Sequence, residues 1–130
     1  MCLSIAINRP ADVLAKGERF GFEWIVLHNG MGYRCGYVRI PKGHPWHGKD
    51  YEEISAEVYG GLTFSESDED GAHWVGFDCM HAGDSLDRHL RASDPFRLSH
   101  PGAVIRTQEY VESECRSLCN QAAAATKEEP

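Results

Sequence analysis

The sequence predicts an α+β fold, with a mainly antiparallel sheet of about four strands and a long C-terminal helix packed on one face. Two observations predict it. Segments rich in aromatic and β-branched residues, separated by glycine-containing turns, come first. One long amphipathic segment comes last. The 130 residues fit a single domain, 1–130, in which we expect 1–20 to be an N-terminal segment and 126–130 a frayed tail.

The first predicted elements are a short helix and a β-hairpin. Ala11–Lys16 is expected to form one or two helical turns that end at Gly17. Phe22–Asn29 is rich in aromatic and β-branched residues, which is typical of a strand. Tyr33–Ile40 returns after the turn Gly30-Met31-Gly32, where glycine accepts positive φ. We therefore expect these two strands to pair antiparallel.

The middle of the chain alternates loops with one weak strand. Pro41–Lys49 is rich in proline and glycine and is expected to be a loop. Asp50–Ala56 is predicted to be a short helix or an irregular turn. Glu57–Phe64 is predicted to be a strand weakened by its Gly60-Gly61 pair, and Ser65–Gly71 an acidic turn.

A fourth strand is predicted over Ala72–Cys79. Strict alternation cannot turn both Trp74 and Phe77 toward one core. This spacing predicts either burial on both faces of the sheet or a bulge at Gly76.

The C-terminal part is predicted to hold a short helix, a loop and a long helix. Asp84–Ala92 is the short helix, with Asp84 as its N-cap, and Ser93–Ala103 is the loop. Thr107–Ala125 is the long helix, capped by Thr107. Its predicted core-facing stripe recurs at helical spacing: Val111, Cys115, Leu118 and Ala122.

Charge is segregated along the chain, which has 13 basic and 20 acidic residues and a net charge of −7. Asp50–Asp70 contains acids and no Lys or Arg, whereas Gly32–Lys49 contains Lys and Arg and no acid. The blocks could pair across neighbouring strands, or they could form a positive surface for an anionic ligand beside an acidic surface for a basic partner. The net negative charge argues against non-specific binding of duplex nucleic acid.

The composition also bears on the cellular compartment. The 5 cysteines are an odd number without a Cys-x-x-Cys pair, which argues against a disulfide framework and a zinc ribbon. The sequence has no apolar run of the roughly 18 residues that a membrane span needs, and its N-terminus has no signal-peptide pattern. We therefore expect a cytoplasmic protein without a membrane partner.

Two short segments carry the candidate chemistry. In Gly43–Gly48, His44 and His47 could chelate a metal, or they could be incidental loop residues. In Phe77–Asp84, two carboxylates, a thiol and an imidazole lie close in sequence and could act as a base with its orienting partner, add metal ligands, or only stabilise turns.

If the two segments lie side by side, they would form one concave surface. Its tentative metal ligands are His44, His47, Asp78 and His81, which suit zinc or another divalent ion. Without a metal, the surface would bind a ligand or partner through Lys42, His44, Trp46, His47, Lys49, Tyr51, Asp78, His81 and Asp84. No catalytic residue is assigned, because nucleotide-binding glycine motifs and the serine-hydrolase elbow are absent from the sequence.

Three strings carry a family resemblance: GYVRIPKGHPWHGKDY (Gly36–Tyr51), GGLTF (Gly60–Phe64) and WVGFDCMHAGD (Trp74–Asp84). In this order, and followed by a helix like Tyr110–Cys115, they resemble a family of small uncharacterised proteins encoded in bacteriophages and prophages. The resemblance covers roughly Glu23–Leu118. It implies no activity or substrate, but it implies a context: accessory genes of mobile elements, which include inhibitors of host defence such as anti-CRISPR proteins.

Three functional hypotheses follow. The first is a phage- or prophage-derived accessory protein that is not an enzyme and binds a host protein or a small anionic ligand. The second is a metal-dependent hydrolase that uses the His44/His47 and Asp78/His81 loops. The third is an interaction module without a small-molecule site. Small size, absent catalytic motifs and segregated charge favour the first, and the sequence leaves a homo-oligomer open.

Overall fold

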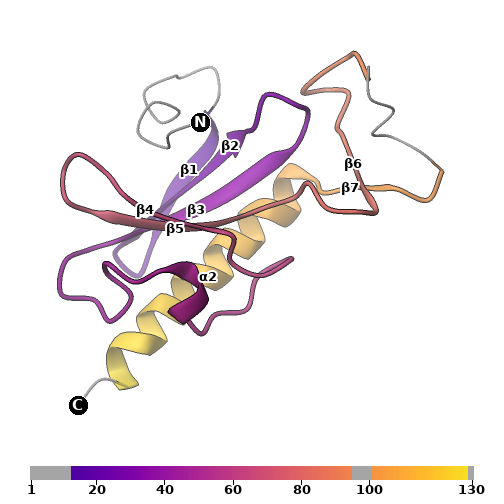
Figure 1. Ribbon diagram of the computed structural model, residues 1–130. Coiled ribbons are helices and arrows are strands. Elements are labelled where there is room, and N and C mark those ends of the chain that lie inside the picture. The colour runs from indigo at the N-terminus through magenta and orange to yellow at the C-terminus, as the bar shows by residue number, and fades with distance from the viewer. Residues whose placement is uncertain (1–12, 95–100, 129–130) are drawn as a thin grey trace.

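The computed structural model describes residues 13–94 and 101–128 (Figure 1). One long helix lies across one face of a five-stranded sheet, with a separate two-stranded pair at one end of the molecule. The strands and the single turn of 3-10 helix, η2, precede the helix in the chain. Their bounds are β1 Val13–Arg19, β2 Phe22–His28, β3 Arg34–Ile40, η2 Tyr51–Glu53, β4 Phe64–Ser67, β5 His73–Asp78, β6 Asp84–Ser85, β7 Val104–Ile105 and α2 Gln108–Glu128.

The predicted α+β class is confirmed, but the sheet has five strands rather than about four. Its order is β1-β2-β3-β5-β4, and all neighbours are antiparallel. The β2–β3 hairpin is confirmed, with a register from Trp24↔Val38 to His28↔Arg34. In its turn, the Asn29 side chain accepts hydrogen bonds from the N–H groups of Met31 and Tyr33, which holds the two strands in register.

The fifth strand, β1, lies where a helical turn was expected. The prediction of a helix over Ala11–Lys16 is therefore wrong for its described part. Gly17 does not end a helix but pairs with Trp24 on β2. A Cβ at Gly17 would stand 2.5 Å from the indole of Trp24, so the indole occupies the space that a side chain at this position would need. The tertiary contact with Trp24 outweighs the local pattern.

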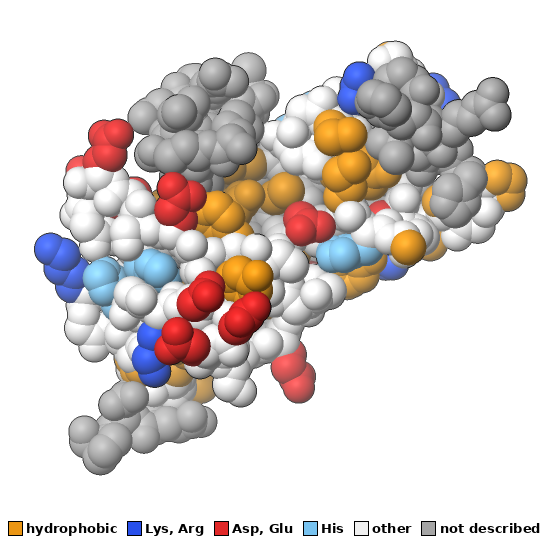
Figure 2. Space-filling model, in the orientation of Figure 1, with side chains coloured by type: hydrophobic (Ala, Val, Ile, Leu, Met, Phe, Trp, Pro, Cys, Tyr) orange, Lys and Arg blue, Asp and Glu red, His pale blue; other side chains and the backbone are white. Residues whose placement is uncertain are grey.

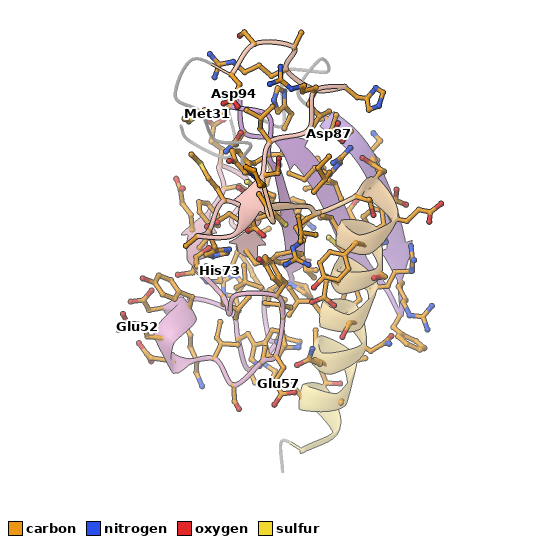
Figure 3. The ribbon with its side chains drawn as sticks, turned by 90° about the vertical axis from the view of Figure 1, so that its right-hand side faces the viewer. Met31, Glu52, Glu57, His73, Asp87 and Asp94 are labelled. Atoms are coloured by element: carbon orange, nitrogen blue, oxygen red, sulfur yellow. The ribbon has the colours of Figure 1, made fainter. Side chains whose placement is uncertain are left out.

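The predicted strand over Glu57–Phe64 is also wrong, because β4 begins only at Phe64. Gly60 and Gly61 both have positive φ, 71° and 79°, so they form a turn instead of continuing a strand. The backbone before the turn bonds to side chains of α2 instead of to a strand. The Glu57 N–H donates to the side chain of Gln121, whose amide nitrogen donates in turn to the Glu57 carbonyl. The Tyr59 N–H donates to the Glu114 carboxylate. Figure 3 shows Glu57 beside α2, whereas Glu52 lies farther out on η2.

The predicted fourth strand is confirmed as β5, and both faces of the sheet are buried there. Phe77 packs in the core between the sheet and α2, together with Val26 and Val38. Trp74 packs on the opposite face against Ile25 and Leu27. Of the two alternatives for this strand, burial on both faces is therefore the one observed.

Asp84–Ala92 is not a helix, which corrects the prediction that Asp84 is an N-cap. Asp84 instead begins β6, which pairs parallel with β7 through Asp84↔Val104. Its carboxylate is buried and binds other side chains. Farther along, Asp87 forms a buried ion pair of 3.0 Å with Arg34 of β3, which fixes this segment to the sheet. Part of the predicted loop Ser93–Ala103 lies outside the described residues.

Helix α2 confirms the predicted long helix and its cap. The Tyr110 N–H donates to the Thr107 side chain over 3.2 Å, as an N-cap residue requires. The predicted stripe Val111, Cys115, Leu118 and Ala122 is fully buried against the sheet. Within the described part of the chain, no helix is long and apolar enough to span a membrane.

Replacing Leu118 by Ala is expected to lower the free energy of unfolding by about 2–5 kcal/mol, the usual range for a buried leucine. Urea denaturation followed by circular dichroism measures this. Arg116→Ala is the control, because Arg116 lies on the same helix and makes only a partly exposed ion pair of 3.9 Å. Its effect should stay within about 1 kcal/mol. A comparable loss for both variants would mean that the stripe is not the main helix–sheet contact.

Candidate functional site

The histidines of the Gly43–Gly48 loop are bonded to the backbone of other segments. The His44 ring accepts a hydrogen bond from the Trp46 N–H at Nδ1, so Nε2 carries the proton and donates to the Ala122 carbonyl over 2.8 Å. His47 Nε2 lies 2.9 Å from the Gly71 carbonyl. These bonds attach the loop to the end of α2 and to the start of β5.

The other histidine segment lies at the opposite end of β5. The His47 ring packs on His73, the first residue of the strand, with centroids 5.8 Å apart. His81 follows Asp78, the last residue of the strand. A strand of this length spans roughly 16 Å, and Figure 2 shows histidine side chains at two separate places on the surface. Among residues 13–94 and 101–128, no group of His, Cys, Asp and Glu is arranged to hold a metal. The four tentative ligands therefore form no joint site there.

The remaining residues of the predicted ligand surface are also spread out. Trp46 is buried in the core, and Tyr51 begins η2. Lys42 lies over Gly71 in a hollow of about 290 Å³ that Asp70 also lines. The Lys49 carbonyl lies 2.8 Å from a ring nitrogen of His73, which ties the loop to β5. The loop is thus anchored at several points, and its lysine ammonium groups do not converge on one cavity.

A different group of side chains converges around Asp84, and we call it the Asp84 cluster. It comprises Tyr59, Asp78, His81, Asp84, Arg106 and Tyr110. One oxygen of Asp84 accepts from the Tyr59 hydroxyl at 2.5 Å and from Arg106 Nε at 3.0 Å. The other accepts from the His81 N–H at 3.0 Å. The carboxylate is fully buried and fully bonded.

These contacts set the protonation of the cluster. Burial alone would raise the pKa of Asp84, but the hydrogen bonds from Tyr59, Arg106 and His81 outweigh it and lower the pKa below its ordinary value. Burial and the Asp84 carboxylate raise the pKa of Tyr59, so the phenol keeps its proton and donates it to Asp84. The hydrogen bond to Asp84 raises the pKa of Arg106. Asp84 and Arg106 thus form an ion pair with Tyr59 as a neutral donor.

Aromatic contacts make the Asp84 cluster compact. The Arg106 guanidinium lies 4.4 Å from the ring centroid of Tyr59 and 5.5 Å from that of Tyr110. The Tyr59 ring contacts His81 with centroids 5.3 Å apart. Gly60 lets these rings approach, because a Cβ there would stand 2.5 Å from the His81 ring. The sequence singled out Asp78, His81 and Asp84 but missed the two tyrosines and the arginine.

His81 is the imidazole of the cluster. Its two ring nitrogens lie 3.4 Å from Asp78 and 3.3 Å from Asp84, and its side chain is 33% exposed. Burial raises the pKa of the nearby Cys79 thiol to about 12 and leaves it a poor nucleophile at neutral pH. Five side chains of the cluster are only partly buried and reach the surface: Tyr59, Asp78, His81, Arg106 and Tyr110.

Comparison with protein-family models, with curated proteins and with solved structures finds no match. The resemblance to phage-encoded proteins stays a prediction.

The lowered pKa of Asp84 predicts a pH dependence of stability. A carboxyl whose pKa is lower in the folded than in the unfolded state stabilises the fold above the unfolded value, near 3.8, and this stabilisation disappears as the pH falls through the folded value. Asp84→Asn should therefore cost about 1–3 kcal/mol at pH 7. The difference between variant and wild type should shrink toward pH 2. Urea denaturation at several pH values checks this, and a difference independent of pH would contradict it.

The histidine loop gives a second prediction. His44→Ala should lower the melting temperature, because it leaves the buried Ala122 carbonyl and Trp46 N–H without their ring partner. His47→Ala should have a smaller effect, since its ring is only partly buried. Elemental analysis should find the same metal content in wild type and both variants. Loss of a stoichiometric metal in either variant, with the fold intact, would restore the metal hypothesis.

Proposed function

We propose that this chain is an accessory protein of bacteriophage or prophage origin that inhibits a host defence system by binding a host protein. The observation that carries the proposal is a group of exposed apolar residues beside the Asp84 cluster. Met80, Val104 and Ile105 are 37%, 47% and 43% exposed. Protein interfaces combine apolar side chains with a surrounding polar rim, and these residues beside the polar cluster offer both.

β7, which carries Val104 and Ile105, is joined through the backbone to the turn that follows Met80. The Val104 N–H donates to the Gly83 carbonyl over 2.9 Å, which brings β7 against the turn after Met80. Arg106 follows Ile105 directly and reaches back to Asp84. The surface therefore combines methionine and aliphatic side chains with Tyr59, Tyr110 and Arg106. Met, Tyr and Arg are enriched in protein interfaces, and Tyr and Arg also carry much of the binding energy there.

The internal bonding of the Asp84 cluster favours this role. The two charged groups Asp84 and Arg106 already pair within the chain, so docking need not leave either charge buried and unpaired. The ion pair and the stacked rings also hold the surface in one arrangement, which reduces the entropy lost on binding.

A host protein fits the charges better than a small anion does. On the basic strand β3, Arg39 lies 3.7 Å from Glu23 and 3.9 Å from Asp68, and Lys42 shares its hollow with Asp70. The carboxylates beside these two side chains weaken the attraction for a small anion. The two loops of the metal-dependent hydrolase hypothesis lie at opposite ends of β5, which argues against a joint metal site.

A phage-infection assay tests the proposal. A bacterial host with an active CRISPR system that targets a phage should regain plaques when it expresses the wild-type protein. Met80→Asp and Ile105→Asp should abolish this rescue, because a charge at the centre of an interface costs about 2 kcal/mol or more, roughly a 30-fold loss of affinity. Melting temperatures should be unchanged, since both side chains are exposed.

Phe20→Asp is the matched control, because Phe20 is an exposed large hydrophobic residue at the β1–β2 turn, away from the Asp84 cluster. It should rescue plaques as the wild type does. Equal rescue by the Met80 and Ile105 variants would exclude this surface as the contact. Failure of the wild type to rescue in hosts with different CRISPR and restriction systems would contradict the anti-defence role.

A further inference from the structure

Strand β1 forms one edge of the described sheet. It pairs with β2 on one side, and no strand in residues 13–94 and 101–128 pairs with its other side. An edge strand presents backbone N–H and C=O groups that can bond to another strand. β1 has 7 residues, whereas β4, at the opposite edge, has 4. The longer edge is the better template for a further strand.

In one antiparallel register, the charges on β1 are complementary to those on a second copy of β1. Lys16 and Glu18 flank Gly17 and point to the same face, because they are two residues apart on a strand. If a second copy of β1 pairs antiparallel with Gly17 at the two-fold axis, Lys16 lies opposite Glu18 of the partner subunit. The symmetry makes this contact occur twice. Opposite charges that face each other across strands stabilise the pairing.

Among the described residues, Lys16 and Glu18 make no ion pair within the chain that would compete with this contact. Glu18 stands directly opposite Glu23 on β2, and like charges in this position repel. Arg39 approaches Glu23 from the other side. Lys16 of the partner subunit would bring a cation to the carboxylate that lacks one.

The shape of the edge agrees with the same register. At the two-fold axis Gly17 would face Gly17 of the partner subunit, so neither strand brings a side chain of its own to the axis. Beside it lies a hollow of about 510 Å³, whose apolar walls are Trp24, Ile25 and Trp74 and whose rim carries Lys16, Glu18 and Glu23.

We propose that two copies of this chain pair through β1, antiparallel about a two-fold axis at Gly17, and join their five-stranded sheets into one continuous sheet. The Asp84 cluster lies at the end of β5 that is formed by Asp78, and it contains no residue of β1, so it is not part of this contact. The dimer therefore presents two copies of the proposed binding surface.

Charge reversal tests the register. Sedimentation equilibrium at low ionic strength should show a wild-type dimer. Lys16→Glu and Glu18→Lys should each weaken it about tenfold or more, because two attractive contacts become repulsive. The double variant Lys16→Glu/Glu18→Lys should dimerise like the wild type, since the two charges are only exchanged. A mixture of the two single variants should form a heterodimer, because both contacts then join opposite charges.

Two results would overturn the proposal. One is a wild-type protein that stays monomeric over the accessible concentration range. The other is a dimer that neither single reversal weakens, which would place the interface elsewhere. Circular dichroism serves as the check on folding, because Lys16 and Glu18 are exposed and their reversal should leave the spectrum unchanged. Met80→Asp should still dimerise, so failure here is distinguishable from failure of the proposed host contact.

Discussion

The close contact between α2 and the middle of β3 is the constraint on which the rest of the structure depends. A Cβ at Gly36 would stand 2.7 Å from the Cys115 sulfur and 2.6 Å from the Phe77 ring, so only glycine lets the helix approach the sheet this closely. Around this point, the buried stripe of α2 packs on residues from β2, β3 and β5. Removing apolar surface from water over this layer is the main stabilising term of the domain.

The helix then organises the long segment between β3 and β4. Three places on α2 bond to that segment: the Ala122 carbonyl with His44, Gln121 with Glu57, and Glu114 with the Tyr59 N–H. Polar groups at the border of the helix face thus replace strand pairing for a segment rich in glycine and acids. Because of these bonds, the segment follows α2, and Tyr59 is carried to the Asp84 cluster.

The Asp84 cluster shows how one buried carboxylate can organise the side chains around it. A fully buried carboxylate is costly unless it is paired, and Arg106 and Tyr59 provide the pairing. The bonds to Tyr59, Arg106 and the His81 N–H satisfy both oxygens of Asp84. The same bonds fix the neighbouring apolar side chains in place. The pairing that a buried charge requires therefore holds Tyr59 and Arg106 together at this place.

The sequence alone determined the β2–β3 hairpin, β5 and α2 with its buried stripe, because these depend on local periodicity, glycine turns and a capping threonine. The strand β1, the path of the Tyr59 segment and the role of Asp84 were decided only by the tertiary structure. β1 depends on Trp24 lying against Gly17, and the Tyr59 segment depends on side chains of a helix more than fifty residues away. Asp84 looked like a helix cap because its partners, Tyr59 and Arg106, are distant in sequence. Local patterns record which residues are apolar and where the chain turns, but the bonds of a buried charge are fixed by residues that meet only when the chain folds.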